Sequence, residues 1–181
     1  MPSSARPSAI VLALHGPPAV GKSTLAEARS RQLAWPLLDK DDLKDVLDGQ
    51  TPQAGTLSYA LLLRLVDRQL RQGVSVVCDS PLLERTYQGL RAIAADRNAR
   101  LAIVRCRCSD PAVWRQRIEA RQGQGLPAHH STTWTAVERF LAQPGVVYPI
   151  ADACLEVDTL RPLAVLVAEI LPGLDQIASP P

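Results

Sequence analysis

A nine-residue segment near the start of the chain carries the residue types and spacing that bind a phosphate chain. The segment consists of Gly16, Pro17, Pro18, Ala19, Val20, Gly21, Lys22, Ser23 and Thr24. It fits the pattern G-x-x-x-x-G-K-[ST], in which glycines let the backbone fold closely around an anion, so that successive N–H groups point at it. The lysine would reach the β- and γ-phosphates of a nucleotide, and the Ser23 hydroxyl would hold Mg²⁺.

The sequence on either side fits this phosphate-binding loop, or P-loop. Residues 9–14 form an apolar run of buried-strand length, and residues 23–33 have the composition of a helix. A strand before the loop and a helix after it are the structural context that the motif requires. We therefore predict a nucleoside triphosphate site. The sequence has no guanine-reading N-K-x-D motif, which favours ATP as the nucleotide.

An acidic cluster follows a short apolar run at residues 37–39. Asp39 and Asp41 form a D-x-D, with Asp42 next and Lys44 two residues further on. Phosphoryl transfer to a hydroxyl needs a carboxylate that orients the acceptor oxygen and takes its proton. Asp41 is the favoured candidate for that base, and one of the two carboxylates could contact Mg²⁺ through water. The alternative is that Asp41 or Asp42 caps the following helix.

A fourth carboxylate, Asp79, follows the apolar run at residues 74–78. A polar residue at the end of a strand next to the P-loop strand resembles the Walker B position, where an Asp holds Mg²⁺ directly or through water. We expect Asp79 to belong to the site, with either magnesium or the acceptor as its partner. The alternative is that Asp79 or Ser80 caps a helix that begins after Pro81.

Arginines precede the one segment without periodicity. Arg117 and Arg121 share a face of a predicted helix over 111–121, and the glycine-containing loop at residues 122–132 follows them. They could move over the phosphates as that loop closes and stabilise charge in the transition state. The alternative is a solvated helix face with Glu119 interleaved. The loop histidines His129 and His130 are weaker candidates for a substrate role.

Strand and helix patterns alternate along the whole chain. Strands are predicted over 9–14, 37–39, 74–78, 101–108 and 153–157, and helices over 23–33, 42–47, 57–72, 83–98, 111–121, 133–143 and 162–171. This alternation predicts an α/β fold, a five-stranded parallel sheet with helices on both faces, in which ligands gather at the carboxyl ends of the strands. We expect a single domain over residues 1–181, with a small lid at about 117–132 and a loose tail at about 173–181.

Net charge, cysteine content and the absence of targeting segments bear on the partners and the location of the protein. The net charge is +2, with 17 Arg and 3 Lys spread along the chain and no block of like charge, so nothing argues for nucleic-acid or membrane binding. The four cysteines, Cys78, Cys106, Cys108 and Cys154, fall in strand-like segments, which predicts reduced, buried thiols without a metal role. No secretory signal or membrane span is evident, so we expect a cytoplasmic protein.

These residues together resemble the P-loop kinases of adenylate-kinase-like fold, in the branch of small AAA-type ATP-binding and zeta-toxin-like proteins. The resemblance runs from residue 10 to about residue 171. It implies two lid arginines, onto which Arg117 and Arg121 fall. It also implies that the loop at residues 159–162 packs on adenine, with Arg161 stacking on the base.

Two acceptor motifs compete within this resemblance. Residues 39–44 resemble the motif of phage-type polynucleotide 5′-hydroxyl kinases, which implies Asp41 as general base and Lys44 as a contact to the acceptor phosphate. That second position is usually Arg, and Lys lacks the bidentate guanidinium fork. The Asp39-x-Asp41 pair also resembles the D-x-D of shikimate-type kinases, which act on small molecules.

The favoured function is an ATP-dependent kinase that uses Mg²⁺ and transfers the γ-phosphoryl group to a hydroxyl of a small metabolite, nucleoside, sugar or antibiotic. A polynucleotide 5′-hydroxyl kinase is the alternative, although aromatic residues make up only 4% of the chain and offer little for base stacking. A nucleotide-dependent switch without an acceptor is a second alternative. The oligomeric state remains open.

Overall fold

A five-stranded parallel sheet forms the centre of the protein. The computed structural model describes residues 9–122, 132–152 and 154–178. The strands are β1 (Ile10–His15), β2 (Leu37–Asp39), β3 (Val76–Asp79), β4 (Arg100–Arg107) and β5 (Cys154–Asp158), in the order β2-β3-β1-β4-β5. Every pair is parallel, so all five strands end at the same edge of the sheet. This confirms the predicted α/β fold with a five-stranded sheet.

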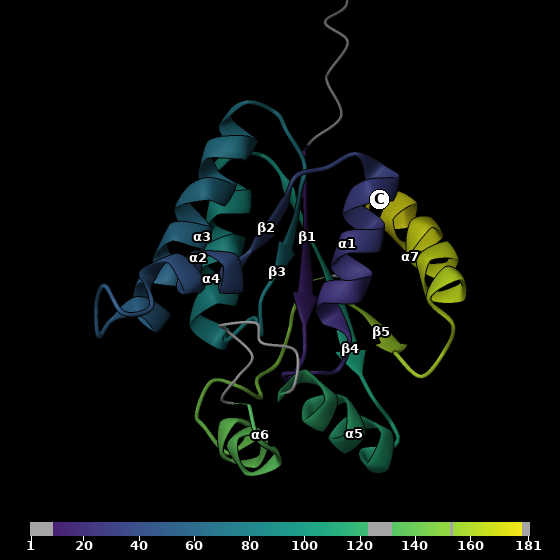
Figure 1. Ribbon diagram of the computed structural model, residues 1–181. Helices are drawn as coiled ribbons and strands as arrows, with labels where there is room; N and C mark the ends of the chain where they lie inside the picture. The colour runs from purple at the N-terminus through teal and green to yellow at the C-terminus, as the bar shows by residue number, and fades with distance from the viewer. Residues whose placement is uncertain (1–8, 123–131, 153, 179–181) are drawn as a thin grey trace, which may run out of the picture.

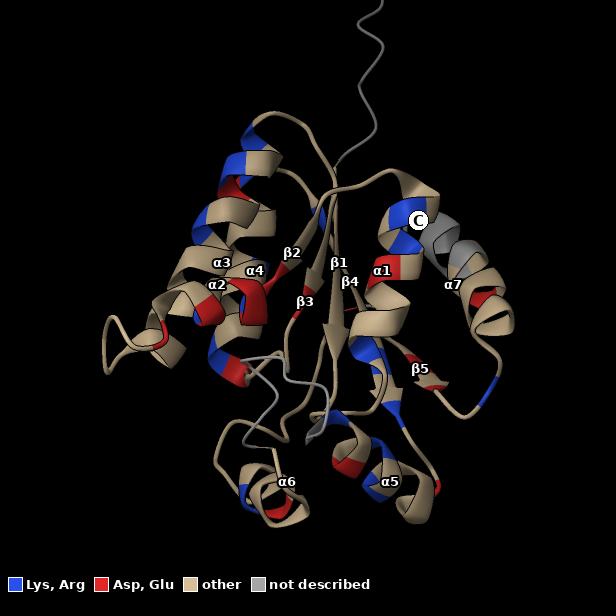
Figure 2. Ribbon diagram, viewed as in Figure 1, with Lys and Arg blue, Asp and Glu red and all other residues tan. Residues whose placement is uncertain are grey.

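Helices cover both faces of the sheet (Figure 1). They are α1 (Lys22–Leu33), α2 (Lys40–Leu47), α3 (Ala54–Arg71), α4 (Glu84–Asp96), α5 (Pro111–Gln122), α6 (Trp134–Leu141) and α7 (Leu163–Ala178). Helices α1 and α7 lie on one face, and α3 and α4 lie on the other with α2 beside them. Helices α5 and α6 lie below the carboxyl ends of the strands. Figure 2 shows both signs of charge on most helices.

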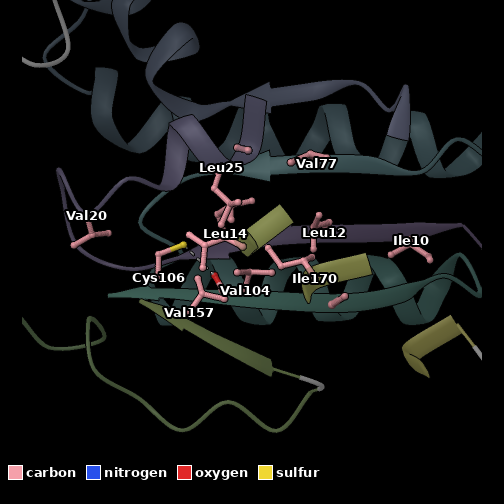
Figure 3. Packing of buried hydrophobic residues seen from close by; sticks show 13 residues of the cluster. Ile10, Leu12, Leu14, Val20, Leu25, Val77, Val104, Cys106, Val157 and Ile170 are labelled. Carbon is pink, nitrogen blue, oxygen red and sulfur yellow. Dashed lines mark hydrogen bonds between the residues drawn. The ribbon is translucent and has the colours of Figure 1, made fainter. Parts of the chain in front are cut away.

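The strands are apolar on both faces because each face packs against helices. Alternate residues of β1 therefore belong to two different clusters: Leu12 and Leu14 face α1 and α7, whereas Val11 and Ala13 face α3 and α4. All four side chains are fully buried. Figure 3 shows the first cluster, in which Leu25 of α1 and Ile170 of α7 meet the sheet.

The cysteines differ in burial. Cys78 and Cys106 lie in the interior as predicted, and Cys108 is half-buried. Cys154 is exposed, so the prediction of a buried thiol is wrong there. The reason is the position of β5 at the edge of the sheet, where one side has no neighbouring strand. Within the described residues, no group of three or more His, Cys, Asp or Glu could hold a metal ion.

Several boundaries differ from the sequence pattern by one or more residues, among them those of α2, α3 and α7. Helix α3 begins at Ala54, three residues before the predicted start. Helix α2 begins at Lys40, because the Asp39 side chain accepts a hydrogen bond from the backbone N–H of Asp41 and caps it. Helix α7 continues through Pro172 and ends at Ala178, although a proline usually ends a helix and the predicted end is residue 171. Part of the predicted loose tail is therefore helical.

Only part of the predicted lid at about 117–132 lies within the described residues. Residues 117–122 belong to α5, and the described residues resume at Thr132. His129 and His130 lie outside the described residues, so their predicted minor role stays a prediction. No helix in the described ranges is long and apolar enough to cross a membrane.

Candidate nucleotide and acceptor site

The P-loop connects β1 to α1 at the carboxyl edge of the sheet. Gly16 has a φ of 143°, and a Cβ there would collide with the carbonyl oxygen of Cys106 on β4, so only glycine fits. Gly21 has a φ of 96° and is the N-cap of α1, with no side-chain cap. The first N–H groups of α1 therefore remain available to a phosphate. Ala19 also adopts a positive φ, of 61°, which is strain at the site itself.

Lys22 lies inside the fold, with 7% of its surface exposed. Its Nζ donates a hydrogen bond to the Pro17 carbonyl oxygen at 2.9 Å, which holds the side chain back along the loop. Burial lowers the pKa of Lys22, and the negative charge of Asp79 opposes that shift. The ammonium is thus positioned over the loop before a nucleotide binds.

Asp79 ends β3 next to this lysine and is 2% exposed. Its Oδ1 is buried and has no hydrogen-bond partner in the part of the chain that the structure describes. Burial raises the pKa of Asp79, whereas the charge of Lys22 and a hydrogen bond from the Ser23 side chain lower it. A buried carboxylate oxygen without a partner, beside a hydroxyl, fits the oxygen ligands that Mg²⁺ takes in nucleotide sites.

Asp39 stands opposite Asp79 in the register of β2 and β3. Burial, followed by the charge of Asp79, raises the pKa of Asp39 to about 7. Its Oδ1 accepts the N–H of Asp41 at 2.7 Å. The helix cap is therefore Asp39, whereas the sequence alternative assigned that role to Asp41 or Asp42.

Asp41 and Lys44 lie on the first turns of α2. Asp41 pairs with Lys40, and its side chain is 33% exposed. The Nζ of Lys44 lies 2.8 Å from Asp48 Oδ2. Asp42 is exposed.

One cavity of about 260 Å³ brings most of the predicted residues together. Its lining includes Lys22, Ser23, Asp39, Asp41, Lys44, Asp79 and Arg121. The same cavity is lined by Tyr59 and Phe140, which the sequence reasoning missed. Neither belongs to a motif, and only the packing of α3 and α6 brings them here.

The two arginines predicted to act together have different surroundings. Arg117 donates to Oγ1 and to the carbonyl oxygen of Thr159, both at 2.9 Å. The Thr159 hydroxyl donates in turn to the Val20 carbonyl oxygen at 2.5 Å, so α5 and the loop after β5 are joined to the P-loop. Arg121 has no such anchor to Thr159, and it lines the cavity described above as well as a second one.

That second cavity, of about 470 Å³, lies on the other side of the P-loop. Gly21, Thr24, Arg117, Arg121, Thr159 and Arg161 are among its lining residues. Arg161 makes two hydrogen bonds to Glu169, at 2.7 and 2.5 Å, which hold its guanidinium in one position. The two cavities share Ala19 and Arg121, which gives the arrangement expected for a nucleotide base on one side and its phosphates on the other.

Trp114 is a further contact that the sequence reasoning missed. Its Nε1 donates to the Pro18 carbonyl oxygen at 2.9 Å, and its ring packs edge-on against Trp134 of α6. Ala19, Ile118 and Val137 form a small buried cluster beside it. The spacing of Trp114 and Ile118, four residues apart on one helix, is the signal that could have indicated a face packed on the loop.

Several solved structures share this fold. A candidate kinase from Chloroflexus aurantiacus superposes with a TM-score of 0.75 at 23% identity, covering 92% of this chain and 98% of that one. A gluconokinase from Sinorhizobium meliloti gives 0.63 at 21% identity, covering 95% and 94%. An APS kinase from Mycobacterium tuberculosis, solved with AMPPNP and APS, gives 0.65 at 17% identity, covering 94% and 99%. At these identities the likeness establishes a shared P-loop fold.

Comparison at the level of sequence gives a match to a family profile. No curated protein sequence matches this chain. A family profile described as AAA domain matches residues 11–143, which is more than half of the chain and includes the P-loop, the acidic cluster, Asp79 and both arginines. The protein therefore belongs to the AAA domain family.

Proposed function

We propose that this protein is a kinase that transfers the γ-phosphoryl group of ATP, with Mg²⁺, to a hydroxyl group of a small molecule. One observation carries the proposal. The lining of a single cavity includes the P-loop residues Lys22 and Ser23 and also Asp41 of α2. A nucleotide switch needs the P-loop residues but no carboxylate for an acceptor, because its attacking water requires no acceptor pocket.

The nucleotide half of the site uses the P-loop. The N–H groups at the start of α1 and the Lys22 ammonium would hold the β- and γ-phosphates. Ser23 and Asp79 would hold Mg²⁺, which when bound neutralises phosphate charge. Arg121 lines the cavities on both sides of the P-loop, so it is well placed to stabilise charge on the transferred group. Arg117 would act through Thr159, by holding the loop after β5.

The acceptor half of the site uses α2. The acceptor oxygen would form the new bond to phosphorus as the bond to the β-phosphate oxygen breaks, and its proton would pass to the Asp41 carboxylate. Lys40 keeps Asp41 paired and oriented. Lys44, already on the cavity wall, would contact an anionic group of the acceptor. Asp39 would support α2 through its cap and could reach Mg²⁺ through water.

The acceptor class is inferred from two observations. The solved structures named as a sugar kinase, a gluconokinase and an APS kinase support a small-molecule acceptor, although each is below 25% identical. Figure 2 shows charges of both signs intermixed rather than one basic face, which offers little to a nucleic-acid backbone. The polynucleotide 5′-hydroxyl kinase is therefore the less favoured alternative.

The test is transfer of labelled γ-phosphate from Mg·ATP to a panel of hydroxyl compounds that includes gluconate, sugars, nucleosides, antibiotics and a 5′-hydroxyl oligonucleotide. We expect label on a small molecule, and a loss of about 10²- to 10⁴-fold in kcat for Asp41→Asn. Asp42→Asn is the matched control, because Asp42 is adjacent but exposed and outside the cavity. Label on the oligonucleotide would favour the alternative. Turnover of ATP that no alcohol affects would contradict a kinase.

A further inference from the structure

A third cavity, of about 400 Å³, lies between the N-terminal half of α3 and the start of α4. Its lining is mostly apolar and includes Gly55, Tyr59, Ala60, Leu63, Leu83 and Thr86. This volume lies within the range of small-molecule pockets. None of the roles assigned above uses this cavity, although it lies near the acceptor half of the site.

The shape of this cavity follows from two glycines. At Gly89 of α4, a Cβ would lie 2.7 Å from Leu63 Cδ1, so the two helices are closely packed at that level. At Gly55 of α3, a Cβ would meet nothing within 4 Å. Gly55, Tyr59 and Leu63 are four residues apart and lie on one face of α3. The helices therefore touch at one end of this face and leave space at the other.

Tyr59 connects this cavity with the acceptor site, because it lines both. The Lys40 Nζ lies 5.5 Å from the centroid of the Tyr59 ring and pairs with Asp41 at the same time. The connection between β3 and α4 also spans the two cavities, with Pro81 in the acceptor site and Leu83 in the apolar one. A ligand with its hydroxyl at Asp41 could thus extend along the Tyr59 ring into the apolar space.

We propose that the acceptor is an alcohol that carries an apolar group, an aryl ring or a branched alkyl chain, which binds in the cavity between α3 and α4. This inference rests on the proposed kinase function. Most of the lining surface is apolar and comes from residues such as Tyr59, Leu63 and Leu83. The polar lining residues Thr56, Arg85 and Thr86 contribute the smaller share of that surface. A polyol placed there would lose its water without replacement, whereas an apolar group gains from leaving water.

The experiment compares two alcohols that differ only by a ring, 3-phenyl-1-propanol and 1-propanol, with gluconate as the polyol. With Mg·ATP, we expect kcat/KM to be about 10- to 100-fold higher for the phenyl compound than for 1-propanol, as for other groups bound in apolar pockets. Ala60→Phe fills the cavity and should reduce this ratio at least about tenfold. Leu61→Phe is the matched control, because Leu61 is on the same helix, 42% exposed, and does not line the cavity.

Binding is measured separately from transfer. Saturation-transfer NMR with 3-phenyl-1-propanol and no nucleotide should detect contact with the wild type and with Leu61→Phe, but not with Ala60→Phe or with Gly55→Leu, a second filling variant. Circular dichroism and Mg·ATP binding confirm that each variant is folded. Binding with this pattern and no transfer to any acceptor would support the cavity and overturn the kinase. Transfer to gluconate without preference for the phenyl compound would support the kinase and overturn the cavity assignment.

Discussion

His15 is the last residue of β1, directly before the P-loop, and its surroundings keep it neutral. Its Nδ1 is buried and has no hydrogen-bond partner among the described residues. Its ring packs edge-on against Tyr148, with the ring centroids 5.7 Å apart. Burial, together with the positive charges of Arg105 and Lys22, lowers the pKa of His15 to about 4. A neutral ring therefore adds no further cation beside Lys22.

The low pKa of His15 predicts a pH dependence of stability. The unfolded chain binds a proton at the ordinary value of 6.5, whereas the folded protein does so only near 4. Between these values the unfolded state holds more protons than the folded state. The free energy of unfolding should therefore increase as pH rises from 4 to 6.5, and decrease as pH falls over the same range. We expect His15→Phe to remove about 1–3 kcal/mol of this change, measured by urea unfolding at several pH values. Equal slopes for both proteins would contradict the assignment.

At the residue scale, the sequence predicted several residues that the structure brings to one cavity, but not all of the residues that line it. Lys22, Ser23, Asp41 and Asp79 were identified from motif and strand position, because the chemistry needs those residue types at those points. Tyr59 was not identified, because a tyrosine on an amphipathic helix is ordinary core composition. Its place on the cavity wall depends on which helices pack together.

At the scale of elements, helix α5 and the loop after β5 are joined to the P-loop by hydrogen bonds. Arg117 bonds twice to Thr159, Thr159 bonds to Val20, and Trp114 bonds to Pro18. These contacts support the proposal that Arg117 positions the wall of the nucleotide cavity, in addition to the predicted role near the phosphates.

The positioning role predicts a separation of kinetic constants for Arg117→Lys. A lysine keeps the positive charge but cannot make two parallel hydrogen bonds to Thr159. We expect KM for ATP to rise about tenfold, from the loss of roughly 1.4 kcal/mol of binding, with a smaller change in kcat. Gln116→Ala is the control, since Gln116 is exposed on the same helix. A fall in kcat alone would assign Arg117 to the transferred phosphate instead.

The periodicity of the sequence predicted all five strands and their parallel arrangement. The ends of helices were harder to predict, because they depend on single side chains and on tertiary packing. Helix α2 starts where Asp39 supplies a cap, and α7 continues past Pro172 although a proline usually ends a helix. The order of the strands has no signal in the sequence, since it arises from packing between distant segments. The contact of α5 with the P-loop has one weak signal, the spacing of Trp114 and Ile118 on one helix face.

At the scale of the whole molecule, nucleotide and metal should raise stability together. Asp39 and Asp79 are partners in register at the carboxyl ends of β2 and β3. Burial raises the pKa of both carboxyls, and the charge of Asp79 raises that of Asp39 further. A divalent cation would offset this concentration of negative charge, and the P-loop binds the nucleotide only when folded.

We therefore expect Mg·AMPPNP at a hundred times its Kd to stabilise the protein by about 2.7 kcal/mol. For a chain of this size, that corresponds to a rise in Tm of roughly 5–10 °C, measured by thermal unfolding. AMPPNP with EDTA should give a smaller rise. In Asp79→Asn, the difference between magnesium and EDTA should nearly vanish. A full magnesium effect in that variant would show that Asp79 is not a ligand of the metal.

The hydrogen bond from Thr159 to Val20 has a consequence for synthesis on the ribosome. The P-loop residues are made early, but the threonine that contacts them follows more than a hundred residues later, after the strand at the sheet edge. A nascent chain that stops before Thr159 would contain the whole nucleotide motif with one wall of its cavity missing. Tight nucleotide binding would then begin only after the last strand has emerged, and would mark the completion of the sheet.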